Sequence, residues 1–190
     1  SNQSFRREDF FDQPANPVSD KQNQGGGYVK GGANWNFSNT MNVFFNAGFI
    51  SRQPLFDAVF PGFANDINPN LQNEEITSFE LGYGYISNNL KINFNAYSTS
   101  WGNRFISRGI NLPGGIDGTA QFDDVSVLHQ GIEIEADYRL TSDFKLRGML
   151  SLGDWRYTKD FSANVFDDQN NPVPGQDVTL YVKDAKVGDA

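Results

Sequence analysis

Regular alternation of apolar and polar residues constrains this chain more than any other feature of its sequence. Six segments alternate with a period of two, which is the period of a β-strand with two different faces. They form three pairs joined by short turns: residues 28–37 with 41–51, 77–87 with 90–101, and 128–140 with 144–157. The turns consist of Ser, Asn, Thr and Asp, which favour tight hairpins. The pattern therefore predicts three antiparallel hairpins.

The register of each hairpin separates apolar from polar side chains. Counting back from the turns pairs Ala33 with Phe45, Tyr83 with Phe94, and Ile134 with Leu150. The positions between them carry the charges, and in the third hairpin Asp137 falls opposite Arg147, a favourable cross-strand pair. A shift by one residue would mix the two faces. The agreement across three hairpins predicts a sheet with one apolar and one polar face.

Such a sheet suits either a soluble β-sandwich or a membrane β-barrel, and three details favour the barrel. The strands run about 10–14 residues, as spanning strands do, whereas globular strands usually have about 5–6. Short turns alternate with long loops at 52–76, 102–127 and 158–175. Aromatic residues stand on the apolar face beside the short turns, as in an interfacial girdle: Phe37, Tyr85, Tyr138 and Phe144. We predict an all-β fold of antiparallel, up-and-down strands that forms part of a transmembrane β-barrel, with short periplasmic turns and long extracellular loops.

The composition agrees with this prediction. Mean hydropathy is −0.52 and 38% of residues are hydrophobic, which a barrel tolerates because only every second strand residue faces lipid. No apolar run approaches the roughly 20 residues of a spanning helix. The net charge of −8 argues against nucleic acid as a partner, and the absence of cysteine excludes disulfides and thiol chemistry.

Six clear strands are fewer than the eight with which outer-membrane barrels usually close. Residues 4–11 and 176–183 could supply two weaker strands. A small closed barrel of structural or adhesin type is therefore an alternative to a partial barrel. We expect residues 1–190 to form one partial-barrel domain.

The stretch from Asn68 to Tyr83 resembles a signature of TonB-dependent receptors. It reads Asn-Pro-Asn-Leu, then a glutamate pair, then Glu-Leu-Gly-Tyr. The run from Gly131 to Ala136 is similar to a later strand of the same barrels. Together with the strand from Gly31 to Phe37 and the run Ser51-Arg52-Gln53-Pro54, the overall resemblance, over residues 28–157, is to receptors of Bacteroidota type. Asn73 departs from the pattern, which often has Pro there.

This resemblance implies a barrel of 22 strands in the outer membrane of a Gram-negative bacterium, with an N-terminal plug. Such a receptor imports a scarce nutrient, such as a siderophore, glycan or peptide, with energy relayed by TonB. The implied partners are outer-membrane lipid, the imported molecule, TonB through the plug, and in some receptors a surface lipoprotein. Neither plug nor TonB box is visible in the chain, so it would supply wall and loops.

Residues with catalytic or metal-binding chemistry are scarce. His129 is the single histidine, and the acidic pairs at 123–124 and 167–168 lack the alternating ligand spacing of a calcium loop. We therefore expect no enzyme activity, no catalytic residues, no metal site and no cofactor.

The candidate ligand contacts are aromatic loop residues and one arginine: Phe56, Phe60, Phe63, Trp101 and Arg104. Aromatic faces suit stacking on sugars or siderophore rings, and arginine suits carboxylates. The alternative is that these aromatic side chains pack the loops together or belong to the outer girdle.

Overall fold

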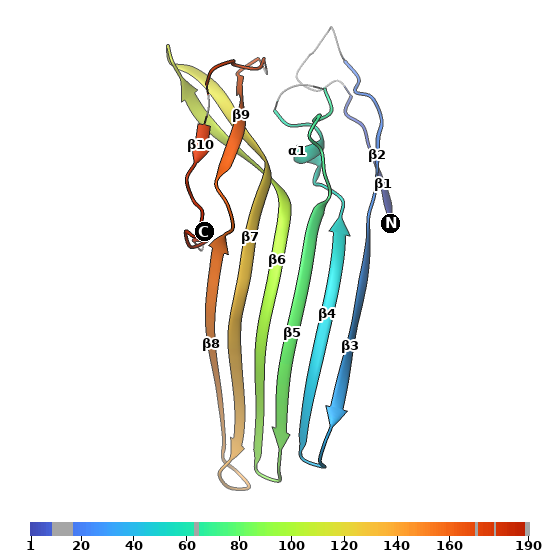
Figure 1. Cartoon of the computed structure of the whole chain (residues 1–190), viewed down its shortest axis with the longest axis vertical. Helices are drawn as coiled ribbons and strands as arrows, with labels where there is room; N and C mark the ends of the chain where they lie inside the picture. The colour runs from blue at the N-terminus through green and yellow to red at the C-terminus, as the bar shows by residue number, and fades with distance from the viewer. Residues whose placement is uncertain (9–16, 63–64, 170, 177, 189–190) are drawn as a thin grey trace.

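The computed structural model describes residues 1–8, 17–62, 65–169, 171–176 and 178–188, and almost all of its regular structure is strand (Figure 1). Ten strands and one short helix follow one another in these described residues. They are β1 (Asn2–Phe5), β2 (Gln22–Gly25), β3 (Gly27–Asn36), β4 (Met41–Arg52), α1 (Phe56–Val59), β5 (Glu74–Ile86), β6 (Leu90–Leu112), β7 (Ile116–Arg139), β8 (Lys145–Tyr157), β9 (Phe161–Asp167) and β10 (Val178–Leu180).

The six strands β3 to β8 form a wall in which each strand pairs antiparallel with the next one along the chain. The predicted register is confirmed in all three hairpins. Ala33 lies opposite Phe45, Tyr83 opposite Phe94 and Ile134 opposite Leu150. The wall is an open sheet with β3 and β8 at its edges, which agrees with part of a barrel.

One short turn joins each hairpin at the lower end of the wall in Figure 1. In each turn a Ser or Thr hydroxyl accepts a hydrogen bond from a backbone N–H two or three residues later, at 3.1–3.2 Å. The hydroxyls belong to Ser38, Ser87 and Thr141. These bonds satisfy turn backbone that the strand ladder leaves unpaired, which is why such residues favour turns.

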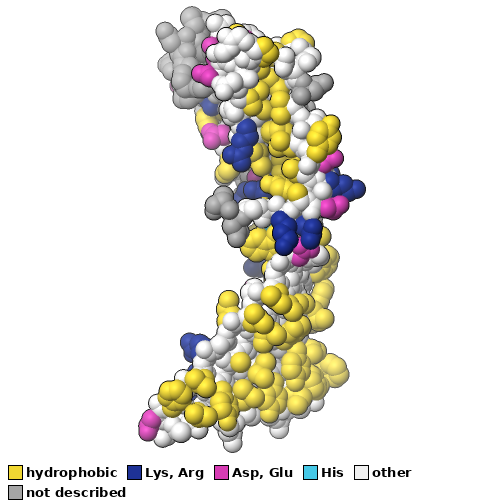
Figure 2. All heavy atoms as spheres, turned by 90° about the vertical axis from the view of Figure 1, so that its left-hand side faces the viewer, with side chains coloured by type: hydrophobic (Ala, Val, Ile, Leu, Met, Phe, Trp, Pro, Cys, Tyr) yellow, Lys and Arg dark blue, Asp and Glu magenta, His cyan; other side chains and the backbone are white. Residues whose placement is uncertain are grey.

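The lower half of the wall has the predicted apolar face, without a second layer over it in the described part of the chain. Its side chains are solvent-exposed, and Figure 2 shows hydrophobic side chains covering one side of this half. We name this surface the apolar band, and it includes Val29, Phe45, Phe79, Leu81, Ile132, Leu150 and Leu152. An uncovered apolar face of this kind contradicts the β-sandwich alternative, in which a second sheet would bury it.

The segment 102–127 is not the loop that we predicted from its Asn, Gly and Asp content. There β6 and β7 continue beyond the band as one long hairpin of 23- and 24-residue strands. Register shifts separate this extension from the wall near Arg104. Its turn lies at Gly114 and Gly115, which have φ of 88° and 76°, a backbone conformation that glycine adopts without strain. We call this extension the wing.

The other predicted loops also contain regular structure. The segment 52–76 includes α1, and 158–175 includes β9, which pairs with β7 at the wing. Strand β10 pairs with β9, and β1 pairs with β2 in a separate two-stranded sheet. The described residues of the two terminal segments therefore do not complete the wall, so the eight-stranded closed barrel is not the observed arrangement. Residues 9–11 and 177 of those segments lie outside the described residues.

The buried core lies in the upper half, around the wing. Ala120, Phe122, Val125 and Phe161 pack together there, and Val59 and Phe60 are buried in the 52–76 segment. No helix among the described residues is long and apolar enough to cross a membrane. The lower half of the wall is a single layer, whereas the upper half contains the buried core.

Candidate functional site

Aromatic and charged side chains gather on the polar face of the wall, at the level of the upper edge of the apolar band. Strand alternation places Tyr97, Trp101, His129 and Trp155 on the same face as the mid-strand charges. Together with Arg104 we call them the rim stripe. The stripe crosses β6, β7 and β8 at the level where the single-layer wall meets the folded upper half. A molecule that passes along the polar face would meet it.

Glu74 fixes one end of the rim stripe. Glu74 is only 7% exposed. Its carboxylate forms an ion pair with Arg52 and accepts a hydrogen bond of 2.9 Å from Trp101 Nε1. The register explains this meeting, because Arg52 lies opposite Glu74 and Trp101 lies opposite Ile76, two residues further along β5. One carboxylate therefore holds the indole ring in a fixed orientation.

Arg104 stacks on the same indole ring. Its guanidinium carbon lies 4.3 Å from the ring centroid of Trp101, and that of Arg52 lies 5.2 Å away. Between the two residues lies Asn103, which has a φ of 56° at the register shift after Trp101 and donates from Nδ2 to the Asn73 carbonyl at 3.2 Å. Among the described residues no carboxylate forms an ion pair with Arg104. The site thus presents a cation whose charge is not neutralised by an ion-pair partner.

The other end of the stripe is an aromatic group. The imidazole of His129 stacks on the Trp155 indole at 4.9 Å between centroids, and Trp155 Nε1 donates to the Tyr97 hydroxyl at 3.2 Å. The Nε2 atom of His129 is buried and has no hydrogen-bond partner. This end of the stripe offers flat ring surfaces and one unsatisfied ring nitrogen.

The predicted loop phenylalanines form a different cluster. Phe60 is 1% exposed, and its ring centroid lies 5.1 Å from that of Phe56. The guanidinium carbon of Arg7 lies 5.2 Å from the Phe56 ring centroid and 5.3 Å from that of Phe60. Arg7 also donates to the Phe60 carbonyl at 2.8 Å. Burial lowers the pKa of the Arg7 guanidinium, and the charge of Asp57 opposes that shift. Phe60 therefore packs its loop, as in our alternative, while Trp101 and Arg104 come together on the wall. Phe63 lies outside the described residues.

Asp123, one residue of the acidic pair at 123–124, accepts hydrogen bonds from three asparagine side chains. Asn68 Nδ2 donates to it at 2.7 Å, Asn164 Nδ2 at 3.2 Å and Asn70 Nδ2 at 3.3 Å. These donors come from the Asn-Pro-Asn motif and from β9. The carboxylate therefore joins the 52–76 segment, the wing and β9. No group of three or more potential metal ligands occurs in the described part of the chain.

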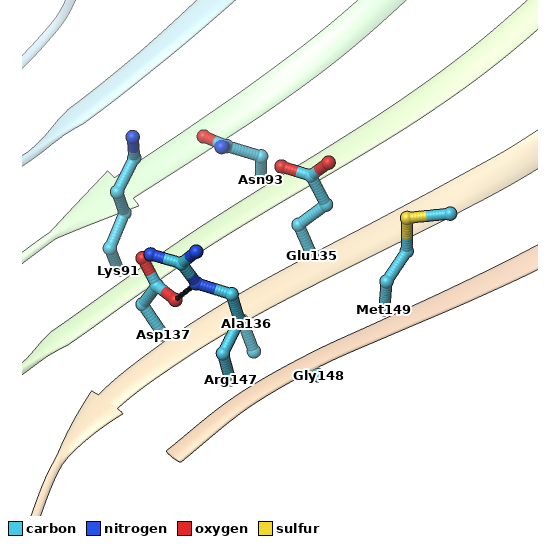
Figure 3. Close-up of a pocket in the computed structure, with 8 residues that line it drawn as sticks. All are labelled: Lys91, Asn93, Glu135, Ala136, Asp137, Arg147, Gly148 and Met149. Carbon is cyan, nitrogen blue, oxygen red and sulfur yellow. Dashed lines mark hydrogen bonds and ion pairs between the residues drawn. The ribbon is translucent and has the colours of Figure 1, made fainter. Parts of the chain in front are cut away.

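A charged groove of about 300 Å³ lies lower on the polar face, near the short turns. Figure 3 shows Lys91, Glu135 and Arg147 extending into the same space from three neighbouring strands. Arg147 Nε lies 2.7 Å from Asp137, the ion pair that the register predicted. Lys145 also pairs with Asp137, whereas Lys91 and Glu135 form no ion pair among the described residues.

Two side chains that organise this region, Glu74 and Asp123, are not among the residues predicted from the sequence. Glu74 was part of a recognised motif, but its partner Arg52 belongs to another hairpin, and the register between hairpins cannot be counted through a long loop. Asp123 was recognised only as part of an acidic pair. Its three amide donors come from segments that are 41 to 55 residues away.

The wall, its uncovered apolar band and its polar inner face define an outer-membrane β-barrel segment. A family model described as "TonB dependent receptor-like, beta-barrel" matches residues 3–184. The chain therefore belongs to the TonB-dependent receptor barrels, a family of outer-membrane receptors and transporters of Gram-negative bacteria that are not enzymes. None of the curated proteins and none of the solved structures with which the chain was compared matches it.

Proposed function

We propose that this chain is part of the wall of a receptor that imports a scarce nutrient across the outer membrane, and that the rim stripe contacts the nutrient. The single observation that supports this most is Arg104, a partly buried cation stacked on Trp101 without an ion-pair partner. Charged side chains inside a protein are usually paired. An unpaired one on the inner face of a transport barrel suits an anionic ligand.

The chemistry of the stripe favours a ligand with an acidic group next to a flat ring. The Arg104 guanidinium can bind a carboxylate through two parallel hydrogen bonds. At the other end of the stripe, the rings of His129 and Trp155 supply a stacking surface. A carboxylate-bearing siderophore, an acidic sugar or a short acidic peptide would satisfy these requirements.

The remaining parts of the function follow from the family. We propose that TonB supplies energy through a plug region, and that a surface lipoprotein can cover the mouth of the barrel. The strand at 31–37 and the run at 51–54, together with the motifs at 68–83 and 131–136, support placing the receptor among those of Bacteroidota type.

The test is uptake by cells that carry the full-length receptor with Arg104→Gln. The radiolabelled ligand is chosen from a panel of a ferric carboxylate siderophore, an acidic oligosaccharide and an acidic peptide. We expect its uptake to require TonB. The variant should bind it about 10- to 100-fold more weakly, because a hydrogen bond to a charged group contributes about 1.5–3 kcal/mol.

Arg108→Gln is the matched control. Arg108 lies four residues further along β6, is exposed, and forms no ion pair among the described residues. Its replacement should leave binding unchanged. Equal affinity of the Arg104 and Arg108 variants, or uptake that persists without TonB, would contradict the proposal.

A further inference from the structure

One row of residues on the polar face is entirely apolar or aromatic. It crosses all six strands of the wall, and each member lies opposite the next in the register: Tyr28, Ile50, Ile76, Trp101, Val127 and Tyr157. We call it the inner row. The next row on the same face, two residues away on each strand, includes Lys30, Ser78 and Thr99. The inner face of an outer-membrane barrel is usually polar, so the inner row is an exception that asks for an apolar partner.

The described chain covers only one end of the inner row. At this end Val127 is fully buried, and the ring of Tyr157 packs edge-on against that of Phe161, with 5.6 Å between their centroids. At the other end Tyr28 is 74% exposed and Ile50 is 40% exposed. Exposed apolar patches with a polar rim mark sites of interaction. The part of the row on β3 to β6 therefore presents an apolar surface that the described residues leave uncovered.

A cavity of about 400 Å³ lies at this open end, within the range of about 300–1,000 Å³ that holds small ligands. Its apolar lining includes Tyr28, Ile50 and Ile76. One cation and one carboxylate, Lys30 and Glu80, also line it, so the cavity has no excess of either charge. It opens on the polar face, whereas the lipid tails of the membrane contact the apolar band on the opposite face. Membrane lipid is therefore not its occupant.

The inner row connects this cavity with the rim stripe. Trp101 belongs to both, because it lies opposite Ile76 in the row and carries the stacked guanidinium of Arg104. Neighbouring strands lie about 4.8 Å apart, so the open part of the row, from Tyr28 to Trp101, spans about 14 Å. Arg104 adds a cation without an ion-pair partner at the Trp101 end. An apolar strip that ends at a cation matches a linear apolar group that ends in an acid.

We propose that the inner row binds an aliphatic chain whose carboxylate lies at Arg104. The chain runs along Ile76, Ile50 and Tyr28 and enters the cavity, and an extended dodecanoate chain has about the length of this strip. The inference rests on the proposed function for the acidic group. It adds a second part of the ligand, a linear chain on β3 to β5, on the opposite side of Arg104 from the rings of the rim stripe.

The experiment measures binding of linear carboxylates to the full-length receptor in lipid nanodiscs, with binding to empty nanodiscs subtracted. The probes are octanoate, decanoate, dodecanoate and tetradecanoate, with dodecyltrimethylammonium as the cationic counterpart. We expect affinity to rise by about twofold for each methylene group, since one side of the chain contacts the row, and to level off beyond dodecanoate. The cationic probe should bind about tenfold more weakly than dodecanoate or worse, because it meets the charge of Arg104.

Variants of the row should remove the preference for long chains. We expect Ile50→Asn and Tyr28→Ser each to weaken dodecanoate binding by about tenfold, because an apolar contact is replaced by a polar one. Met149→Asn is the matched control. Met149 is also an exposed apolar residue on the polar face, but it lies lower on the wall, opposite Glu135. Its replacement should leave the affinity for dodecanoate unchanged.

The same measurements separate this inference from the proposed function. Arg104→Gln should weaken octanoate and dodecanoate by the same factor, and loss of that effect would contradict the contact with the acid. Affinity that does not depend on chain length, or no binding of dodecanoate, would overturn the inference. This series uses the wild type, so it decides the question even if a variant fails to fold. Row variants that lower the thermal midpoint without changing binding would also overturn it, because another segment of the receptor would then cover the row.

Discussion

Glu74 holds the Trp101 ring of the rim stripe in place. Its carboxylate is largely buried, and it receives both the Arg52 guanidinium and the Trp101 indole N–H. A buried carboxylate requires such partners, because burying a charge without them is costly. The glutamate therefore fixes the ring on which Arg104 stacks.

Replacing Glu74 should disturb the site more than the fold. We expect Glu74→Ala to destabilise the receptor by about 1–3 kcal/mol, since it removes a charged hydrogen-bond acceptor whose partner Arg52 is partly solvent-exposed. Glu74→Gln, which keeps an acceptor for the indole, should cost less. Thermal unfolding of both variants beside Glu75→Ala, an exposed neighbour, provides the check. Equal midpoints for Glu74→Ala and Glu75→Ala would disprove the role of Glu74.

Among the elements, the wing differs most from what its composition indicates. Residues 104–112 and 116–122 are paired strands, although their Asn, Gly and Asp content is typical of loops. Above the apolar band a strand has no lipid face, so the alternation that identifies the wall is not required there. The Asp123 carboxylate connects the wing to the Asn-Pro-Asn motif, because it accepts hydrogen bonds from the side-chain amides of Asn68 and Asn70.

Asp123→Ala should remove the hydrogen bonds that hold the Asn-Pro-Asn motif at 68–70, while the wall keeps its structure. We expect amide hydrogen exchange to become at least about tenfold faster around Asn68 and Asn70, because a charged acceptor of three hydrogen bonds is lost. Exchange at residues 132–138 should not change. Asp124→Ala, which removes an exposed partner of Lys159, is the control. If amide exchange around Asn68 is as slow in the Asp123 variant as in the wild type, the 66–70 segment is held by other contacts.

At the scale of the whole molecule, the two faces of the wall determine which substitutions it tolerates. Leu150 lies in the apolar band and Ser151 faces the polar side, opposite Glu133. We expect Leu150→Arg to destabilise the barrel by about 2–4 kcal/mol in urea unfolding from lipid vesicles, the penalty for arginine near the bilayer midplane. Ser151→Arg, near a glutamate and away from lipid, should be nearly neutral. Similar losses for both would contradict the assignment of the faces.

The sequence predicts the wall well and the upper half poorly, for a physical reason. Lipid imposes alternation on every spanning strand, and the turns fix the register, so pairs such as Ile134 with Leu150 can be counted directly. The rim stripe depends on contacts between hairpins and on the bulge at Asn103, which no local pattern specifies. Trp101 and Arg104 were identified by residue type, but their stacking and the burial of Phe60 required the fold.

The length of β6 has a consequence outside the membrane. At about 3.3 Å per residue its 23 residues span about 75 Å. Even with the 35–45° tilt of barrel strands it rises roughly 55–60 Å, more than twice the height of a 25 Å apolar band. The tip at Gly114 therefore stands far above the bilayer on a continuous strand. An antibody directed at residues 112–116 would therefore bind an epitope that stands clear of the bilayer surface.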